Sequence, residues 1–456
     1  FANAPRPASG GEGNHRLSDT DTPSASPLPK EGQRGSWVPQ SSTNARRPLW
    51  RGFVLVFVVA LIARGGFGLV RLQRSADPAA LEFPDEHQYW FMAGSLARGD
   101  GLRDEMRFRA TRMPLYPAFL ALFVDQPNAV PIAKASQWIL GALAAPLIYA
   151  LGQMLAGRRV GLIAALIVAL DPFLIFFSSL LLTETPTITA ICALWLLLAV
   201  VLASPPLRDS LARWLAIGIA AALCVYLRES NLGLVVIAII FALVARRWDR
   251  KTLLGSCAAL AFVVISLLPW AARNRSVLGE WCWLTTRAGI SLYDGVGPQA
   301  TGASDLAAVQ RTGAAADLSE TQWNEHFKRE AWSAIRRDPA RIVRLAGRKL
   351  LRLWNPLPNV EAYRGGYAQW ISAIWTIPLF ILAIVGAARW TILYRRKGLL
   401  VVAFLLLPAV YFSLLHSLYI GSVRYRLPAM PMIALLAAMA FMPRSRREPT
   451  PRPDPG

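Results

Sequence analysis

The run ASQWILGALAAPLIYALGQMLAG, residues 135–157, contains no charged residue and is long enough, as a helix, to cross the hydrocarbon core of a bilayer. Three further charge-free runs share this property: residues 185–207, 252–272 and 365–388. The composition agrees, because 54% of the 456 residues are hydrophobic and 17% are charged, whereas charged residues make up about a quarter of an ordinary soluble protein. The sequence therefore predicts an all-α polytopic membrane protein and excludes a soluble multidomain enzyme.

Interrupted apolar runs raise the predicted number of transmembrane helices to about ten. These runs are residues 52–70 with Arg64, 160–183 with Asp171-Pro172, two short spans within 214–245 that flank Arg228-Glu229, 398–415 and 427–442. Basic clusters then fall at every second connection, which places both termini in the cytoplasm under the positive-inside rule. The clusters are Arg158-Arg159, Arg246 to Lys251, Arg395 to Lys397 and Arg444 to Arg447.

This topology divides the chain into five parts. They are a disordered cytoplasmic tail over 1–48, a transmembrane catalytic core over 49–272 with a first outer loop over 71–134, a periplasmic segment over 273–364, C-terminal transmembrane helices over 365–442, and a second disordered cytoplasmic tail over 443–456. The first tail is rich in Pro, Ser, Gly and Arg and buries too little apolar surface to fold. We expect juxtamembrane helices in the first outer loop and a small α or α/β fold in the periplasmic segment.

The net charge of +21 is distributed over several kinds of segment. In a soluble chain, such a charge would suggest a nucleic-acid partner. Here much of it lies in the orientation clusters, and no basic stripe carries stacking aromatics, so no nucleic-acid partner is predicted. The basic stretch from His326 to Trp354 has apolar residues near helical spacing. It is interpreted either as a helix in the outer membrane surface that faces lipid phosphates, or as a helix packed on its own domain with a solvated basic face.

The first outer loop holds the densest polar cluster in the chain. Its motifs are Phe83-Pro-Asp-Glu-His-Gln-Tyr89, Leu96-Ala-Arg-Gly-Asp-Gly101 and Arg112-Met-Pro-Leu-Tyr-Pro117. By itself, an Asp-Glu pair that opens a helix can simply complement the helix dipole. A second pair, Asp104-Glu105, lies among arginines and is interpreted as local ion pairing on a loop.

These motifs together resemble glycosyltransferase family 39, which includes the protein O-mannosyltransferases and the bacterial aminoarabinose transferases. The resemblance continues in Leu180-Leu-Leu-Thr-Glu184, Pro269-Trp-Ala-Ala-Arg-Asn274 and Arg424-Tyr-Arg-Leu-Pro428, and covers roughly Leu49 to Met442. It implies a C-type glycosyltransferase fold in the bacterial inner membrane. It further implies inverting transfer of a hexosyl or pentosyl group, at the periplasmic face, from a polyprenyl-phosphate donor to a hydroxyl on a lipid, glycan or protein.

The resemblance also implies roles for individual residues. Asp85 matches the catalytic aspartate and suits a general base, because a carboxylate can accept the proton of an attacking hydroxyl. Glu86, the second catalytic candidate, would support Asp85 or orient the acceptor. Three arginines are candidates for binding the donor phosphate: Arg112, Arg424 and Arg426. The substrate-binding candidates are Tyr89, Tyr116, Glu184, Arg228 and Arg273. The four histidines include no ligand-spaced pair, and metal use varies within the family, so a divalent metal is left open and no ligands are predicted.

Two other classes of function compete with the enzyme. A transporter or flippase of lipid-linked saccharides would also contain intramembrane charges and broken helices, but its polar groups would lie near mid-bilayer rather than at the outer boundary. A non-catalytic membrane subunit would lack a cavity that joins Asp85 to the region of Arg112.

Overall fold

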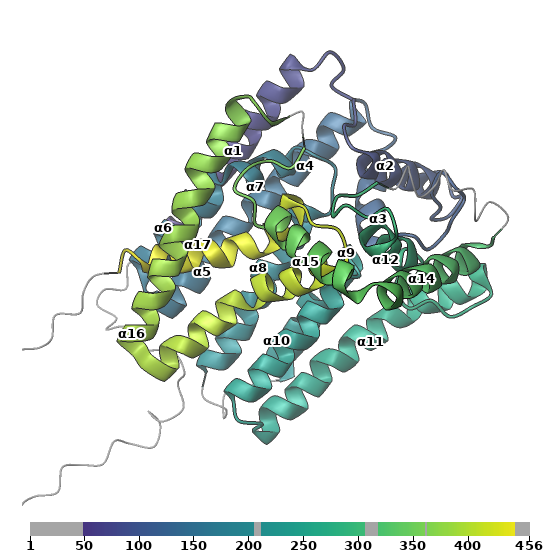
Figure 1. Ribbon diagram of the computed structural model, residues 1–456. Helices are drawn as coiled ribbons and strands as arrows, with labels where there is room; N and C mark the ends of the chain where they lie inside the picture. Colours follow the sequence, from purple (N-terminus) through teal and green to yellow (C-terminus); the bar gives the residue numbers. More distant parts are fainter. Residues whose placement is uncertain (1–48, 205–210, 306–317, 361–362, 443–456) are drawn as a thin grey trace, which may run out of the picture. The chain divides into compact units, whose positions relative to one another are not determined.

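The computed structural model describes residues 49–204, 211–305, 318–360 and 363–442, and all the regular secondary structure in these residues is helical (Figure 1). The all-α class predicted from the sequence is thereby confirmed. Within the described part of the periplasmic segment there is no strand, which favours the all-α form of that prediction. The two predicted tails, 1–48 and 443–456, lie outside the described residues.

Five helical stretches are long and apolar enough to cross a membrane. They are α1 (Leu49–Arg74), the consecutive helices α4 (Ala129–Ala142) and α5 (Ala144–Ala156), α8 (Glu184–Ala203), α11 (Arg250–Leu278) and α16 (Tyr367–Leu418). A sixth candidate consists of α6 (Arg158–Leu170) and α7 (Pro172–Ser178), which are bent by 51° at Asp171, the residue between them. The chain is therefore a multi-pass membrane protein.

The remaining predicted spans take less regular forms. α16 contains two of them, because the backbone leaves helical geometry at Arg395 (φ 47°, ψ −124°). Two short apolar helices, α9 (Leu211–Leu227) and α10 (Asn231–Ala245), flank Arg228-Glu229 as predicted. The last predicted span is α-helical only in α17 (Met430–Met439), because a 3-10 helix, η4 (Val423–Ala429), precedes it. The number of ten spans stays a prediction.

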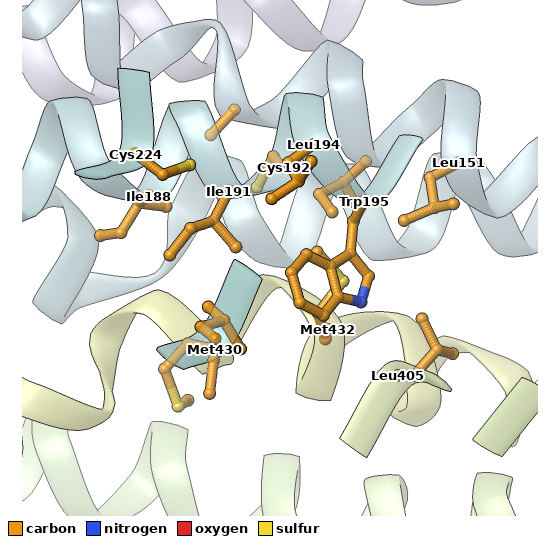
Figure 2. Packing of buried hydrophobic residues seen from close by; sticks show 14 of the residues in the cluster. Leu151, Ile188, Ile191, Cys192, Leu194, Trp195, Cys224, Leu405, Met430 and Met432 are labelled. Atoms are coloured by element: carbon orange, nitrogen blue, oxygen red, sulfur yellow. The ribbon is translucent and has the colours of Figure 1, made fainter. Parts of the chain in front are cut away.

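Tight packing in the interior holds these helices together. Figure 2 shows Trp195 of α8 lying near Leu405 of α16 and Met432 of α17. Trp195 is fully buried, and its indole nitrogen donates to the Phe404 carbonyl at 3.0 Å, so its one polar atom is satisfied. Arg64 in α1 is also buried; it donates to the Ala169 carbonyl at 3.1 Å near the end of α6, where carbonyls lack helical partners.

The outer parts of the chain form shorter helices. They are α2 (Pro84–Ala97) and α3 (Leu115–Ala121) in the first outer loop, and α12 (Ala288–Val296), α14 (Glu320–Arg337) and α15 (Pro339–Leu353) in the periplasmic segment. Glu320 joins the two regions: its carboxylate accepts from the backbone amides of Arg109 and Ala110 at 2.5 and 2.8 Å. The first residue of α14 thereby holds the loop segment that leads to Arg112.

The basic helix α15 packs on the protein by one face only. Ile342, Leu345 and Leu353 are buried, and α15 lies against α16 and η4. On the opposite face, Val343 is 72% exposed and Leu351 is 77% exposed. One face of α15 therefore packs on its own protein and the other leaves apolar side chains uncovered, and contact with the membrane surface stays a prediction.

Candidate active site

The first turn of α2 places two neighbouring carboxylates in different environments. Pro84 occupies the first turn, where the missing amide hydrogen is not needed, and Glu86 closes the turn. One Glu86 oxygen accepts from the amides of Glu82 and Phe83 at 3.0 and 3.1 Å, and the other accepts from the Leu181 amide at 2.7 Å. Glu86 is fully buried and thus anchors the helix start, which leaves Asp85 on the open side.

Asp85 binds two arginines that come from distant parts of the sequence. Its Oδ1 accepts from Nη2 of Arg112 at 2.5 Å, and its Oδ2 accepts from Nη1 of Arg424 at 2.6 Å. Burial by itself would raise the pKa of Asp85, but Arg112 and Arg424 hold that pKa well below its usual value. Asp85 is therefore ionised at neutral pH.

Glu184 extends this network into the protein. Its side chain is fully buried and pairs with Arg424, through Nε and through Nη2, the latter at 3.3 Å. It also accepts from Nη1 of Arg228 at 3.1 Å. Arg424 thus bridges two carboxylates. The network contains three guanidinium groups and two carboxylates, so it carries one excess positive charge. Such a charge suits an anionic ligand.

Aromatic rings support the guanidinium groups. Arg112 lies over Tyr89 at 4.9 Å from the ring centre, and Arg228 lies over Tyr425 at 5.0 Å. Tyr425 also stacks on His416, whose ring is parallel to within 7° at 4.2 Å between ring centres. These contacts restrict the arginine side chains without using their outer hydrogen-bond donors.

Two residues that were not predicted from the sequence complete the polar cluster. Gln88 accepts from Arg112 Nε at 2.9 Å and from Arg287 Nη1 at 3.3 Å. Gln88 follows Asp85 by three residues, a helical spacing that could have revealed it. Arg287 lies directly before α12, and no local pattern distinguishes it. Within the described residues Arg287 has no carboxylate partner, and burial, followed by the charge of Arg112, lowers its pKa.

Asp85 and most of its neighbours line one cavity of about 1330 Å³, whereas the fully buried Glu86 and Glu184 do not. Its polar wall contains Asp85, Gln88, Arg112, Arg228, Arg287 and Arg424. An apolar arm is lined by residues of α1, α7 and α16: Ala63, Phe67, Phe173, Phe176, Ile371 and Leu415. Because Phe67 and Ile371 are also exposed, this arm reaches the surface of the protein between apolar helices.

Comparison with known proteins agrees with the architecture. Residues 113–270, about a third of the chain, match the family of dolichyl-phosphate-mannose-protein mannosyltransferases. The fold is similar to the Archaeoglobus fulgidus oligosaccharyltransferase AglB in complex with an inhibitory peptide and a dolichol-phosphate, with a TM-score of 0.55 and 13% identity over 86% of this chain and 50% of that one. The apo form of the oligosaccharyltransferase from the same organism gives a TM-score of 0.53 at 14% identity, over 87% of this chain and 50% of that one.

These matches confirm the resemblance found in the sequence. The chain shares its fold with the oligosaccharyltransferase, and its residues 113–270 match the mannosyltransferase family. It spans about half the length of the oligosaccharyltransferases. The aminoarabinose transferase ArnT from Cupriavidus metallidurans superposes less well, with a TM-score of 0.38 and 15% identity over 86% of this chain and 78% of that one. No curated protein sequence matches the chain.

Five of the predicted site residues do not line the cavity: Glu86 and Glu184, whose partners are given above, and Tyr116, Arg426 and Arg273. The Tyr116 hydroxyl donates to Gln137 at 2.7 Å in a fully buried cluster. Arg426 is also buried and donates to the Asn355 carbonyl at 2.5 Å. Arg273 donates to the Arg109 carbonyl at 2.6 Å and so supports the loop before Arg112. Arg426 and Arg273 therefore hold backbone carbonyls near the site, whereas Tyr116 binds the side chain of Gln137.

In the second acidic pair, Asp104-Glu105, the Asp104 carboxylate stabilises the fold of its own loop. Asp104 accepts from the amides of Met106 and Phe108, both at 2.9 Å, and from the Thr111 hydroxyl at 3.1 Å. The predicted ion pairing with nearby arginines is wrong for Asp104, because backbone amides and the side chains of Thr111 and Gln88 satisfy its carboxylate instead. In the part of the chain that the structure describes, no group of three or more His, Cys, Asp or Glu side chains could hold a metal ion.

Proposed function

We propose that the protein is an integral-membrane inverting glycosyltransferase. It would move a hexosyl or pentosyl group from a polyprenyl-phosphate donor to a hydroxyl on a lipid, glycan or protein, at the periplasmic face of the bacterial inner membrane. One observation carries the proposal: a single cavity joins the network of Asp85, Arg112 and Arg424 to an apolar arm that reaches the surface between helices. A phosphate attached to a long hydrocarbon has the same two-part character.

The arginines of the cavity supply the donor-phosphate site. Guanidinium groups match phosphate oxygens through paired hydrogen bonds. Arg112 and Arg424 face the cavity, and Arg287 adds a cation whose one hydrogen-bond partner among the described residues is the neutral Gln88. The prenyl chain would follow the apolar arm past Phe67 and Phe173.

The proposed reaction is a single displacement. The acceptor oxygen attacks the anomeric carbon, the bond from that carbon to the phosphate oxygen breaks, and the polyprenyl phosphate leaves with the electron pair. The acceptor proton passes to Asp85. In the free protein both Asp85 oxygens accept from arginines, so Asp85 is a weak base. A donor phosphate shares those guanidinium groups, and its negative charge raises the basicity of Asp85 when the donor is bound.

Replacement of Asp85 tests this function. Asp85→Asn keeps the size of the side chain but removes the base, so we expect transfer to fall by roughly 10²–10⁴-fold. Donor binding should persist, because the variant keeps the same arginines and loses a carboxylate that competes with the phosphate for them. The measurement is formation of glycosylated product by purified protein from polyprenyl-phosphate sugars and a mixture of acceptors, analysed by mass spectrometry.

Asp100→Asn is the matched control, because Asp100 is an exposed carboxylate of the same loop that pairs with Arg103. Full transfer by Asp85→Asn would refute the base assignment. If the wild-type protein moves the lipid-linked sugar across a bilayer without forming a glycosidic product, the chain is instead a transporter or flippase. A non-catalytic subunit is disfavoured, because Asp85 and Arg112 line the same cavity.

A further inference from the structure

The turn between α9 and α10 contributes a second acidic residue to the cavity. Glu229 directly follows Arg228 in this turn, is half-buried, and lines the cavity. The turn is held in place from α16, where the Tyr411 hydroxyl donates to the Ser230 carbonyl. Glu229 is therefore presented to the cavity by a fixed segment of backbone.

Glu229 differs from Asp85 and Asp294, two other carboxylates of the cavity, in its lack of partners. Asp85 binds two arginines, and Asp294 accepts from the Ser304 hydroxyl at 2.6 Å and from the Asp305 amide at 2.9 Å. Among the described residues, the Glu229 carboxylate has neither a hydrogen bond nor an ion pair. Glu105 shares this feature, but its side chain is exposed. A carboxylate that lines the cavity without a protein partner can accept hydrogen bonds from a ligand.

Glu229 lies at the same end of the cavity as the phosphate-binding network. Arg228, the preceding residue, pairs with Glu184, which in turn pairs with Arg424. Tyr419 also lines the cavity, and its hydroxyl has no hydrogen-bond partner among the described residues. Burial and the charge of Glu229 both raise the pKa of Tyr419, so these two side chains lie within electrostatic range of each other.

The hydrogen-bonding character of the cavity decides which part of a ligand Glu229 can meet. Guanidinium groups only donate, and phosphate oxygens of the donor only accept, so these two sets satisfy each other. Sugar hydroxyls donate as well as accept, and their hydrogens need an acceptor. An ionised carboxylate is an acceptor only. Because the sugar is bonded to the phosphate, its hydroxyls would lie within a few ångströms of the arginines. There Glu229 offers a carboxylate that has no partner among the described residues.

We propose that Glu229, together with Tyr419, recognises hydroxyl groups of the transferred sugar and thereby determines which sugar the protein accepts. The inference rests on the proposed glycosyltransferase function and extends it to sugar selection. A site built to hydrogen-bond a hydroxyl discriminates strongly against an analogue that lacks it, because the protein group is then left unpaired.

Binding measurements separate this role from the phosphate site. Wild-type protein and Glu229→Gln, both in lipid nanodiscs, are titrated with undecaprenyl phosphate and with undecaprenyl-phosphate mannose, glucose, galactose, N-acetylglucosamine and arabinose. We expect the affinity for bare undecaprenyl phosphate to change less than about twofold. The affinity for the preferred sugar-bearing lipid should fall roughly 10- to 100-fold, as for loss of a hydrogen bond to a charged group.

Deoxy analogues of the preferred donor then identify the hydroxyl. Removing the hydroxyl that Glu229 binds should weaken binding to the wild-type protein but have no further effect on Glu229→Gln. Tyr419→Phe is the second variant, and it should shift the relative affinities for the sugars while leaving bare undecaprenyl phosphate unaffected. Glu325→Gln is the matched control, because Glu325 is exposed, pairs with Lys328 and does not line the cavity; it should behave as the wild-type protein does.

Three results would overturn the inference. They are equal loss of affinity for bare and sugar-bearing lipid in Glu229→Gln, unchanged binding of the preferred donor by that variant, and no preference of the wild-type protein among the sugars and the bare lipid. Failure of the wild-type protein to bind any polyprenyl phosphate is a different outcome, and it would refute the proposed function as well.

Discussion

Arg424 illustrates how much one residue organises at this site. It binds Asp85 through one nitrogen and Glu184 through two others, although Asp85 lies 339 positions away in the sequence. Taking charges out of water is expensive, and a buried ion pair offsets that cost only when its hydrogen bonds are complete. Glu184 meets this condition, since Arg228 supplies a further donor. The network therefore depends on each of its members.

Removal of the Glu184 charge should be strongly destabilising. Glu184→Gln leaves Arg228 and Arg424 without their shared carboxylate, and loss of one partner from a buried pair costs about 3–5 kcal/mol. We expect a clear drop in the apparent Tm of the purified protein in detergent, measured by a thermal-shift assay.

Glu325→Gln provides the comparison, because Glu325 forms an exposed pair with Lys328 at 3.2 Å. Exposed pairs contribute about 0–1 kcal/mol, so this variant should keep the wild-type Tm. Equal Tm values for the two variants would show that the buried network does not stabilise the fold.

At the scale of elements, α15 holds the end of α16 in place. Lys349 of α15 is fully buried and donates to the carbonyls of Ser417 and Leu418 at 3.2 and 2.5 Å, in the last turn of α16 where carbonyls lack helical partners. Arg352 donates to the Gly421 carbonyl at 3.2 Å. The helix thereby supports the short connection that leads to Arg424.

The buried Lys349 predicts how stability depends on pH. Burial, followed by the charge of Arg341, lowers the pKa of Lys349 from 10.5 to about 8. Between these two values the unfolded chain binds more protons at this site than the folded chain, so the contribution of Lys349 to stability rises with pH. Below about pH 8 both states are protonated and the contribution is constant.

The measurement is the apparent Tm of the wild-type protein and of Lys349→Met from pH 7 to 10. The advantage of the wild-type protein should grow above about pH 8. Lys328→Met, at an exposed position, should show a constant difference from the wild type over the same range. A constant difference for Lys349→Met as well would contradict the prediction.

At the scale of the whole molecule, the distribution of charge predicts its orientation. Basic residues at the α5–α6 connection and at the break in α16 are expected in the cytoplasm, because positive charge is retained there. The periplasmic segment and the first outer loop would then lie together on the outer side. Their contact through Glu320 is consistent with a shared side.

Cysteine labelling tests this orientation. Lys328→Cys in α14 and Lys397→Cys beside the break in α16 are both at exposed positions. They are examined in a background where Cys257 and Cys282, the two native cysteines that are not buried, are replaced by Ser. In intact cells an impermeant maleimide should label position 328 and should reach position 397 only after permeabilisation. The reverse pattern would place the cavity on the cytoplasmic side.

Local patterns in the sequence determined the class of the protein and the position of its polar cluster. Long charge-free runs require helices in a bilayer, because backbone groups in lipid must be satisfied within the segment. The Asp-Glu pair and the Arg-x-Pro motif identified the first outer loop, and the family match and the fold confirm the resemblance that they carried. These features depend on neighbouring residues, so they are visible in one sequence.

Only the tertiary structure decided which side chains meet. Asp85 faces the cavity while the adjacent Glu86 binds backbone amides, and Arg424 faces it while Arg426, two residues on, is buried among carbonyls. Successive residues on a helix or 3-10 turn point in different directions, so position in a motif does not determine orientation. The contact between Arg287 and Gln88 joins residues 199 positions apart. Such contacts follow from how the helices pack, which no local pattern specifies.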